Sequence, residues 1–368
     1  MNNKIDNWCF FNPVRIINAK NGLENNLDLI PPGNALLVTS PSFTKNKITD
    51  KIISNLNSSN VTIYDQVAPN PQLQSIEESY NDFSANNFSC IIALGGGSVI
   101  DTAKALSFLL SNPSVSSLKD ALTNNTTNKA FKRANLIAIP TTSGTGSEVT
   151  PFATIWDKST GSKYSLNGEH IFPTTALLDP TLTQSLPYDT TLHSGLDAIS
   201  HALESIWNIN YSGITTEFAF ESLRIALKHF QKTLSYPENI DSRAAMQLAS
   251  SYAGIAISQT KTAIAHSISY PLTLHHDIPH GLAASFCLEF LIKHYIDTKK
   301  VIPAEKLGVL EGIKKIIASL KLVEKVLAYA SRDEIIKLIP EMFDPNRAKN
   351  YSLPINEGFI KSVISNSI

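Results

Sequence analysis

A buried strand that leads directly into three glycines and then into a helix constrains this chain more than any other feature of its sequence. Residues 90–94 read CIIAL, Gly95, Gly96 and Gly97 follow, and a helical pattern begins near Val99. Glycines allow a tight turn and the close approach of backbone to a ligand. The free N–H groups at the start of a helix, together with its dipole, attract an anion such as pyrophosphate. GGGS alone is explained equally well by a plain strand-to-helix turn.

Three further short apolar segments, at 35–39, 61–64 and 136–139, read as strands separated by helical patterns. Strands that alternate with helices predict a mostly parallel sheet with right-handed crossovers. Ligands of such sheets bind beyond the carboxyl ends of the strands. The stretch 111–128 is rich in Ser, Asn and Thr and is predicted to be a solvated loop.

The pattern changes in the second half of the chain. From about Pro187 onward, long segments have a 3.6-residue apolar period, for example 216–234 and 243–257. The sequence therefore predicts an α/β N-terminal domain with a mostly parallel nucleotide-binding sheet over residues 1–184. An all-α C-terminal domain is predicted over residues 185–368.

Composition excludes several classes of function. The formal net charge of −1 in 368 residues gives no field that favours nucleic acid or an anionic membrane. The N-terminal stretch lacks the apolar core of a signal peptide, and no apolar run approaches the ~20 residues that span a bilayer. The cysteines at 9, 90 and 287 form no CxxC pair, which is typical of a reducing compartment. A cytoplasmic protein is expected.

A second loop rich in small residues follows the segment at 136–139. It reads PTTSGTGSE, and its Thr141, Thr142 and Thr145 can donate hydrogen bonds. A loop of Ser, Thr and Gly is usually only a loop. Two such loops after neighbouring strands, however, would open onto the same crevice, which favours a shared ligand.

Candidate metal ligands lie in the predicted helical domain. Asp197 and His201 are four residues apart and would share one helix face, although an ion pair alone explains that spacing. The segment 266–281 holds four of the nine histidines, including His266 and His280. One carboxylate and three imidazoles would suit Fe²⁺, Zn²⁺, Co²⁺ or Mn²⁺. An open coordination position would polarise a carbonyl oxygen.

Five segments occur in the order IIALGGGSVIDTAK, PTTSGTGSE, LLDPTLTQSLP, GLDAISHALES and HSISYPLTLHHDIPHG. Together they resemble the iron-containing alcohol dehydrogenase family, whose fold is related to that of dehydroquinate synthase. The resemblance runs from about Asn12 to Phe286 and more weakly to the end. It implies reversible hydride transfer between NAD(P)H and a small aldehyde or alcohol, Fe²⁺ as the favoured metal with Zn²⁺ as the alternative, and a homodimer.

The resemblance also implies roles for individual residues. The residues that match cofactor-binding positions of the family are Ser40, Gly95, Gly96, Gly97, Ser98, Asp101, Thr141, Thr142, Thr145 and Lys163. Ser40 directly follows the predicted strand at 35–39. Lys104 lies with Asp101 in the helix behind the glycine turn. The positions of the four metal ligands are matched by Asp197, His201, His266 and His280.

Two departures from the family pattern affect the predicted chemistry. Tyr270 stands where many members have a histidine considered to relay a proton, and an unperturbed tyrosine pKa of about 10 makes that relay uncertain. Ser40 stands where many members have an Asp that repels a 2′-phosphate. We therefore expect NADPH to be accepted. Tyr270 and Lys163 are candidate catalytic residues.

Lys261 is the third departure, because small residues are common at that position. It is either a surface lysine or a cation for an anionic substrate group. The run KTAIAHSISYPLT looks like the subgroup described as phosphonoacetaldehyde reductases. Lys261 is therefore a third candidate catalytic residue, and phosphonoacetaldehyde is a candidate substrate.

Two other functions remain open at this point. A dehydroquinate-synthase-like lyase shares the fold and uses NAD with a metal, but it would need several basic residues and is disfavoured by the Pro-His-Gly motif. A nucleotide-binding protein without enzymatic activity is disfavoured by the full set of ligand-type residues.

Overall fold

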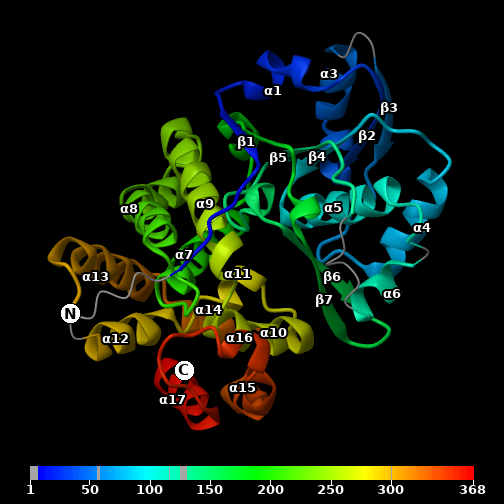
Figure 1. Cartoon of the computed structure of the whole chain (residues 1–368). Coiled ribbons are helices and arrows are strands. Elements are labelled where there is room, and N and C mark those ends of the chain that lie inside the picture. Colours follow the sequence, from blue (N-terminus) through cyan, green and yellow to red (C-terminus); the bar gives the residue numbers. More distant parts are fainter. Residues whose placement is uncertain (1–6, 56–58, 116, 125–130, 300) are drawn as a thin grey trace.

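The computed structural model describes residues 7–55, 59–115, 117–124, 131–299 and 301–368. Figure 1 shows two parts side by side: a sheet flanked by helices, and a packed group of helices built from the second half of the chain. We call them the α/β half and the helical half. This arrangement confirms the predicted fold class, an α/β region with a parallel sheet followed by an all-α region.

Six parallel strands form the sheet of the α/β half. In the order in which they pair, they are β1 (Arg15–Asn18), β8 (Thr175–Leu178), β5 (Leu136–Pro140), β4 (Cys90–Gly95), β2 (Gly33–Thr39) and β3 (Ser59–Tyr64). The four predicted segments lie in β2, β3, β4 and β5. The short strands β1 and β8 are not among the predicted strands. Because β8, β5, β4 and β2 are neighbours, the loops at their carboxyl ends lie along one edge of the sheet.

The central strands bury both of their faces, as expected for a parallel sheet covered on two sides. In β2, Leu36 and Val38 belong to one apolar core, and Ala35 and Leu37 belong to the other. The helices on the first face are α4 (Leu73–Phe83), α5 (Gly97–Ser111) and α6 (Leu118–Thr123). Those on the second face are α1 (Gly22–Asn25), α2 (Pro41–Lys45) and α3 (Ile48–Asn55).

The prediction of a solvated loop over 111–128 is wrong in its middle, where α6 forms. Leu118 and Ala121 are buried in the first core. The polar composition of the stretch hides these two residues, which are three apart and therefore share one helix face. The remainder of the stretch includes positions outside the described residues.

A hairpin outside the main sheet links the two halves. Its strands are the antiparallel β6 (Phe152–Asp157) and β7 (Ser162–Asn167). In Figure 1 it descends from the sheet toward α10 of the helical half. Lys163 of β7 indeed lies over the ring of Tyr270 in α10.

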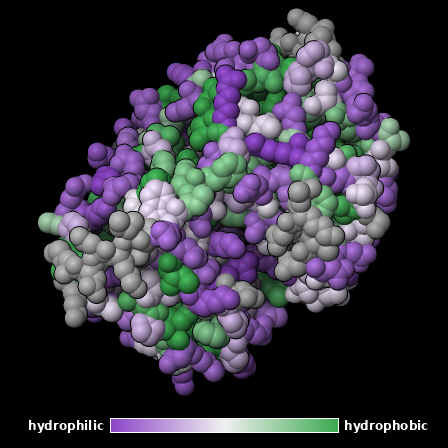
Figure 2. Space-filling model, in the orientation of Figure 1, coloured by the Kyte–Doolittle hydropathy of each residue, from purple (hydrophilic) through white to green (hydrophobic). Residues whose placement is uncertain are grey.

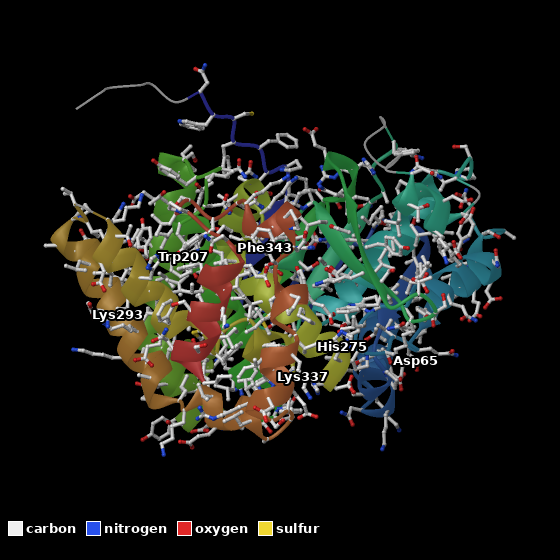
Figure 3. All side chains as sticks on the ribbon, turned by 90° about the horizontal axis from the view of Figure 1, so that it is seen from below. Asp65, Trp207, His275, Lys293, Lys337 and Phe343 are labelled. Carbon is white, nitrogen blue, oxygen red and sulfur yellow. The ribbon has the colours of Figure 1, made fainter. Side chains whose placement is uncertain are left out.

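The helices of the helical half pack around one large apolar core. Trp207 belongs to this core, whereas Lys293 is exposed on the surface (Figure 3). Its helices are α7 (Tyr188–Ile206), α8 (Gly213–Ser235), α9 (Ile240–Thr260), α10 (Ile264–His276), α11 (His280–Ala283), α12 (Leu288–Thr298), α13 (Ala304–Ser319), α14 (Leu322–Leu327), α15 (Arg332–Lys337), α16 (Pro345–Ala348) and α17 (Glu357–Ser367). α8 begins with a capping box in which Ser212 and Thr215 bond to each other's backbone N–H groups. α8 and α9 contain the two predicted periodic segments.

β8 ends at Leu178 and α7 begins at Tyr188, on either side of the predicted boundary at 184/185. The division into two domains at that boundary stays a prediction. Within the described ranges, no helix is both long enough and apolar enough to cross a membrane.

Candidate active site

Four side chains that the sequence proposes as metal ligands meet beside α7. Oδ1 of Asp197 lies 3.7 Å from Nε2 of His201, 3.5 Å from Nε2 of His266 and 3.9 Å from Nε2 of His280. The ligand atoms of the first three residues all lie within 4.8 Å of one another, and these residues are buried. His280, whose side chain is 32% exposed, is the most accessible of the four. The structure therefore brings together residues that are far apart in sequence.

Local structure explains this convergence. α7 places Asp197 and His201 one turn apart on the same face. His280 is the first residue of α11, which packs against α7. A Cβ atom on Gly281 would lie only 1.9 Å from the carbonyl oxygen of His193 in α7. Only glycine fits where α11 comes this close to α7, which explains the glycine of the Pro-His-Gly motif.

The cluster fits a divalent cation. Oδ1 of Asp197 and Nε2 of His266 are buried and have no hydrogen-bond partner within the described chain. Buried polar atoms are normally paired, so each such atom calls for an explanation. Although burial raises it, the pKa of Asp197 is held below its usual value by the neighbouring histidines. An anionic oxygen with three imidazole nitrogens 3.5 to 3.9 Å away is a suitable set of ligands for Fe²⁺ or Zn²⁺.

A buried carboxylate that the sequence analysis does not identify orients one of these ligands. Glu204 of α7 accepts a hydrogen bond from Nδ1 of His266 at 2.7 Å and from the backbone N–H groups of Ala263 and Ala265 at 2.8 and 2.6 Å. Although burial raises the pKa of Glu204, the charge of His266 lowers it overall. Because Glu204 accepts from Nδ1, it fixes the ring so that Nε2 of His266 faces Asp197.

The other two histidines of the 266–281 segment take no part in the cluster. His275, labelled in Figure 3, is exposed, and its Nε2 lies 2.8 Å from Oε2 of Glu341. His276 is the last residue of α10, well beyond His266 in the first turn. Sequence spacing alone does not distinguish these histidines from the ligands.

The two predicted cofactor loops pack against each other at the carboxyl edge of the sheet. A Cβ atom on Gly97 would lie 2.5 Å from Cγ2 of Thr145, and one on Gly96 would lie 3.1 Å from Cγ2 of Thr142. The glycine turn after β4 and the threonine loop after β5 therefore form one surface. Such close packing requires glycine on one side.

The remaining predicted cofactor residues lie at the same edge. The N–H of Thr141 donates to the carbonyl of Gly95 at 3.0 Å, which joins the two loops. Ser40 follows β2 directly and precedes α2. The hydroxyl of Ser98 accepts from the backbone N–H of Asn70 at 3.3 Å. The roles of these residues in cofactor binding stay predictions.

Asp101 is engaged inside the protein. One carboxylate oxygen accepts from Oγ of Ser147 at 2.5 Å, and the other accepts from the N–H of Thr154 at 2.8 Å. These contacts tie α5 to the threonine loop and to β6. Any contribution of Asp101 to cofactor binding would therefore act through the position of that loop.

Lys104, one turn of α5 beyond Asp101, is completely buried. Its ammonium group donates to Oγ of Ser147, to the carbonyl and hydroxyl of Thr150 and to the carbonyl of Phe152, at 2.8 to 3.1 Å. Burial lowers the pKa of Lys104 to about 8, against the opposing charge of Asp101. Lys104 thus fixes the chain that follows the threonine loop.

Lys163 and Tyr270 lie next to the metal cluster. Nζ of Lys163 is 3.4 Å from the centre of the Tyr270 ring. That ring is nearly parallel to the ring of His280, with 6.1 Å between their centres. Burial and the charge of Arg347 lower the pKa of Lys163 well below its usual value, whereas burial raises the pKa of Tyr270. The phenol therefore stays protonated near neutral pH, and its role as a proton relay stays a prediction.

Lys261 lies at the C-terminal end of α9 and is exposed. Its backbone has φ 64° and ψ 170°, a conformation that is strained for a residue with a side chain. Its carbonyl accepts from Nδ2 of Asn208 at 2.9 Å, which helps to hold this conformation. The proposed contact of Lys261 with a substrate stays a prediction.

Comparison with known families decides the class of the protein. The family described as iron-containing alcohol dehydrogenase matches residues 13–180, and the C-terminal region of the Fe-containing alcohol dehydrogenase family matches residues 191–354. The chain belongs to the iron-containing alcohol dehydrogenase family.

Relatives of this iron-containing alcohol dehydrogenase act on several small substrates. It is 32% identical over 270 residues to the sulfoacetaldehyde reductase of Bilophila wadsworthia, covering 73% of this chain and 69% of that protein. It is 31% identical over 285 residues to the NADPH-dependent butanol dehydrogenase of Clostridium saccharobutylicum, covering 76% and 72%. The aldehyde-alcohol dehydrogenase 2 of Entamoeba histolytica is 32% identical over 67% of this chain, but the match spans only 29% of that longer protein.

Solved structures agree with the assignment to the iron-containing alcohol dehydrogenase family. A sulfoacetaldehyde reductase from Bifidobacterium kashiwanohense, in complex with NAD⁺, superposes with a TM-score of 0.88 at 25% identity, over 98% of this chain and 99% of that chain. An iron-containing alcohol dehydrogenase from Thermotoga maritima gives a TM-score of 0.81 at 28% identity, over 98% and 99%.

Membership of this family decides between the dehydrogenase and the two other functions that the sequence left open. The predictions of an oxidoreductase of the alcohol dehydrogenase class and of a metal-binding enzyme are confirmed. The relatives support hydride-transfer chemistry and give no support to the lyase alternative. Besides Glu204, the structure adds Arg347 to the residues around the cluster, because its guanidinium lies 4.3 Å from the centre of the Tyr270 ring.

Proposed function

We propose that this alcohol dehydrogenase reduces short aldehydes that carry an acidic group, using NADPH or NADH, at a metal held by Asp197, His201, His266 and His280. The observation that carries the proposal is the convergence of three imidazole nitrogens on one buried carboxylate oxygen. The acidic group is suggested by the sulfoacetaldehyde reductases among the relatives.

When bound, a divalent metal supplies Lewis acidity toward the carbonyl group and a nicotinamide supplies the hydride. The protein's part is to place and orient the reactants. Glu204 fixes the ring of His266, so that Nε2 faces the centre of the cluster. The glycine turn and the threonine loop offer N–H and hydroxyl donors for a pyrophosphate. Tyr270, whose pKa is raised by burial, holds a proton that it can deliver to the substrate oxygen.

The direct test follows the absorbance of NADPH or NADH at 340 nm with sulfoacetaldehyde, phosphonoacetaldehyde and butanal. Protein treated with a chelator and then reloaded with Fe²⁺ or Zn²⁺ is compared with untreated protein. We expect activity to be lost with the metal and restored by it, and kcat/KM for the acidic aldehydes to exceed that for butanal by about tenfold or more. Protein with bound metal that oxidises neither cofactor with any of the three aldehydes would contradict the proposal.

The cofactor preference is a finer part of the proposal. Ser40 follows β2 directly, at the position where many members of the family have an aspartate that repels a 2′-phosphate, so we propose that NADPH is used. The NADPH-dependent butanol dehydrogenase among the relatives is consistent with this. A kcat/KM for NADH more than about tenfold above that for NADPH would rule it out.

We also propose a cytoplasmic homodimer. β1 is an edge strand of the sheet, and Ile16 on it is 40% exposed, so this edge offers backbone and apolar groups to a second copy. Light scattering during gel filtration would test the dimer, and a mass of one chain at micromolar concentration would contradict it. The cellular location is tested by fractionation.

A further inference from the structure

Two basic side chains lie against the same aromatic ring beside the predicted metal ligands. Nζ of Lys163 is 3.4 Å and Cζ of Arg347 is 4.3 Å from the centre of the Tyr270 ring. The same ring lies nearly parallel to that of His280. Arg347 is therefore separated from a predicted ligand by a single side chain.

Of these two basic groups, only Arg347 has an ion pair among the residues that the structure describes. Arg347 pairs with Asp344, with 2.9 Å between Nη1 and Oδ2. Lys163 has neither an ion pair nor a hydrogen bond within the ranges that the structure describes. Its amino group lies against the rings of Tyr270 and Trp156, and Asp101, Asp197 and Asp344 act on it without forming an ion pair. A guanidinium and an amino group that lie against one ring would both be stabilised by an anionic ligand between them.

The backbone that carries Arg347 is fixed to the helix that carries His266. The hydroxyl of Ser267 donates to the carbonyl of Met342 at 2.6 Å and accepts from the N–H of Asp344 at 2.9 Å. Ser267 directly follows His266 in α10. The guanidinium therefore has a defined position relative to the ligand cluster, which a binding site for a short molecule requires.

We propose that Arg347, with Lys163 beside it, binds the acidic group of the substrate while its carbonyl end lies at the four predicted metal ligands. The inference rests on the proposed function and names the residue that would give it its specificity. A guanidinium has five N–H donors in a planar fork that matches two oxygens of a sulfonate or phosphonate. Its one contact with Asp344 leaves most of these donors for a ligand.

The test compares Arg347→Gln, Arg347→Lys and the unmodified metal-loaded enzyme with sulfoacetaldehyde, phosphonoacetaldehyde and butanal. For Arg347→Gln we expect KM for the acidic aldehydes to rise about 10- to 100-fold, because a hydrogen bond between two charged groups is lost. For butanal, which has no acidic group, KM should rise by a much smaller factor, and any change in kcat should be the same for all three aldehydes. Arg347→Lys should recover part of the loss, and the two acidic substrates reveal whether sulfonate or phosphonate is preferred.

A binding measurement separates recognition from turnover. Calorimetry with 2-hydroxyethanesulfonate, the alcohol that corresponds to sulfoacetaldehyde, should show a weaker Kd for Arg347→Gln by the same factor. Lys337→Gln is the matched control, because it removes one positive charge from the exposed surface of the neighbouring α15 (Figure 3). That variant should leave both the Kd and the KM unchanged.

Three results would overturn the assignment of Arg347. In the first, KM rises equally for butanal and the acidic aldehydes. In the second, KM rises for NADPH instead of the aldehyde, which would make Arg347 a cofactor residue. In the third, Lys261→Ala raises KM for the acidic aldehydes more than Arg347→Gln does. A wrong proposed function would give another result, because the unmodified enzyme would then reduce none of the aldehydes.

Discussion

The two halves of the molecule satisfy their buried charges in different ways. In the α/β half, Lys104 and Asp101 find hydrogen-bond partners in the loops that they position. In the helical half, Glu204 is equally well bonded, but Oδ1 of Asp197 and Nε2 of His266 are buried and find no hydrogen-bond partner among the residues that the structure describes. The surface over the junction of the halves is largely hydrophilic in Figure 2.

This difference indicates which parts of the site are complete without a ligand. The loops at the sheet edge are joined to the protein by hydrogen bonds between protein groups. The ligand cluster lacks one partner, and a cation at its centre would satisfy the unpaired atoms and so stabilise the helical half. Substitutions in the two halves should therefore affect different quantities.

The largest expected effect is the loss of a ligand. His280→Ala should lower kcat/KM by about 10³-fold or more, because the Lewis acidity of the metal contributes several kcal/mol to the reaction. Metal content after dialysis and the rate at 340 nm are the measurements. Stability without metal should change little, since His280 is the most accessible ligand.

His275→Ala is the matched control, a histidine of the same segment that pairs with Glu341 on the surface. It should keep full metal content and activity. If the two variants lost metal to the same extent, the distinction between the cluster and the other histidines would be wrong.

The next effect concerns the α/β half. Lys104→Met should lower the free energy of unfolding by about 3 kcal/mol, because four acceptor contacts are left without their buried cation. Urea unfolding measures this change. Metal affinity should stay the same, in contrast to the ligand variant. Lys119→Met removes a partly exposed partner of Asp157 and should have a smaller effect on unfolding.

Glu204→Gln tests the positioning group of the helical half. We expect metal affinity to fall about 10- to 100-fold, because the amide no longer accepts from Nδ1 of His266 as a carboxylate does. Competition with a chromophoric chelator gives the affinity. Unchanged affinity together with lower stability would show that Glu204 only caps the start of α10.

The smallest effect is a pH dependence that also comes from Lys104. Its pKa in the folded protein is about 8, below the ordinary value of 10.5, so the unfolded chain binds the proton more tightly between these values. The contribution of Lys104 to the free energy of unfolding therefore increases as pH rises from 8 toward 10.5, by about 1 kcal/mol per pH unit. The difference in stability between the unmodified protein and Lys104→Met should grow over this range. A difference that is constant with pH would contradict the lowered pKa.

The sequence by itself determined the fold class, the edge of the sheet where ligands are expected to bind and, through the family resemblance, the four ligand candidates. It could do so because these depend on local patterns: apolar periodicity, glycines after a strand and two side chains one helical turn apart. Gly95 to Gly97 and Asp197 with His201 are examples. The hidden apolar face of α6 shows where composition misleads even for a local element.

The tertiary structure alone decided which distant side chains meet. The packing of α7 against α10 and α11 brings His266 and His280, which the family resemblance already indicated, to Asp197, and it brings Glu204 to the ring of His266. The anchoring of α16 on α10 brings Arg347 to Tyr270. These contacts join residues tens of positions apart, and no period or spacing in the sequence encodes them. They follow from which helix faces bury the most apolar surface against each other.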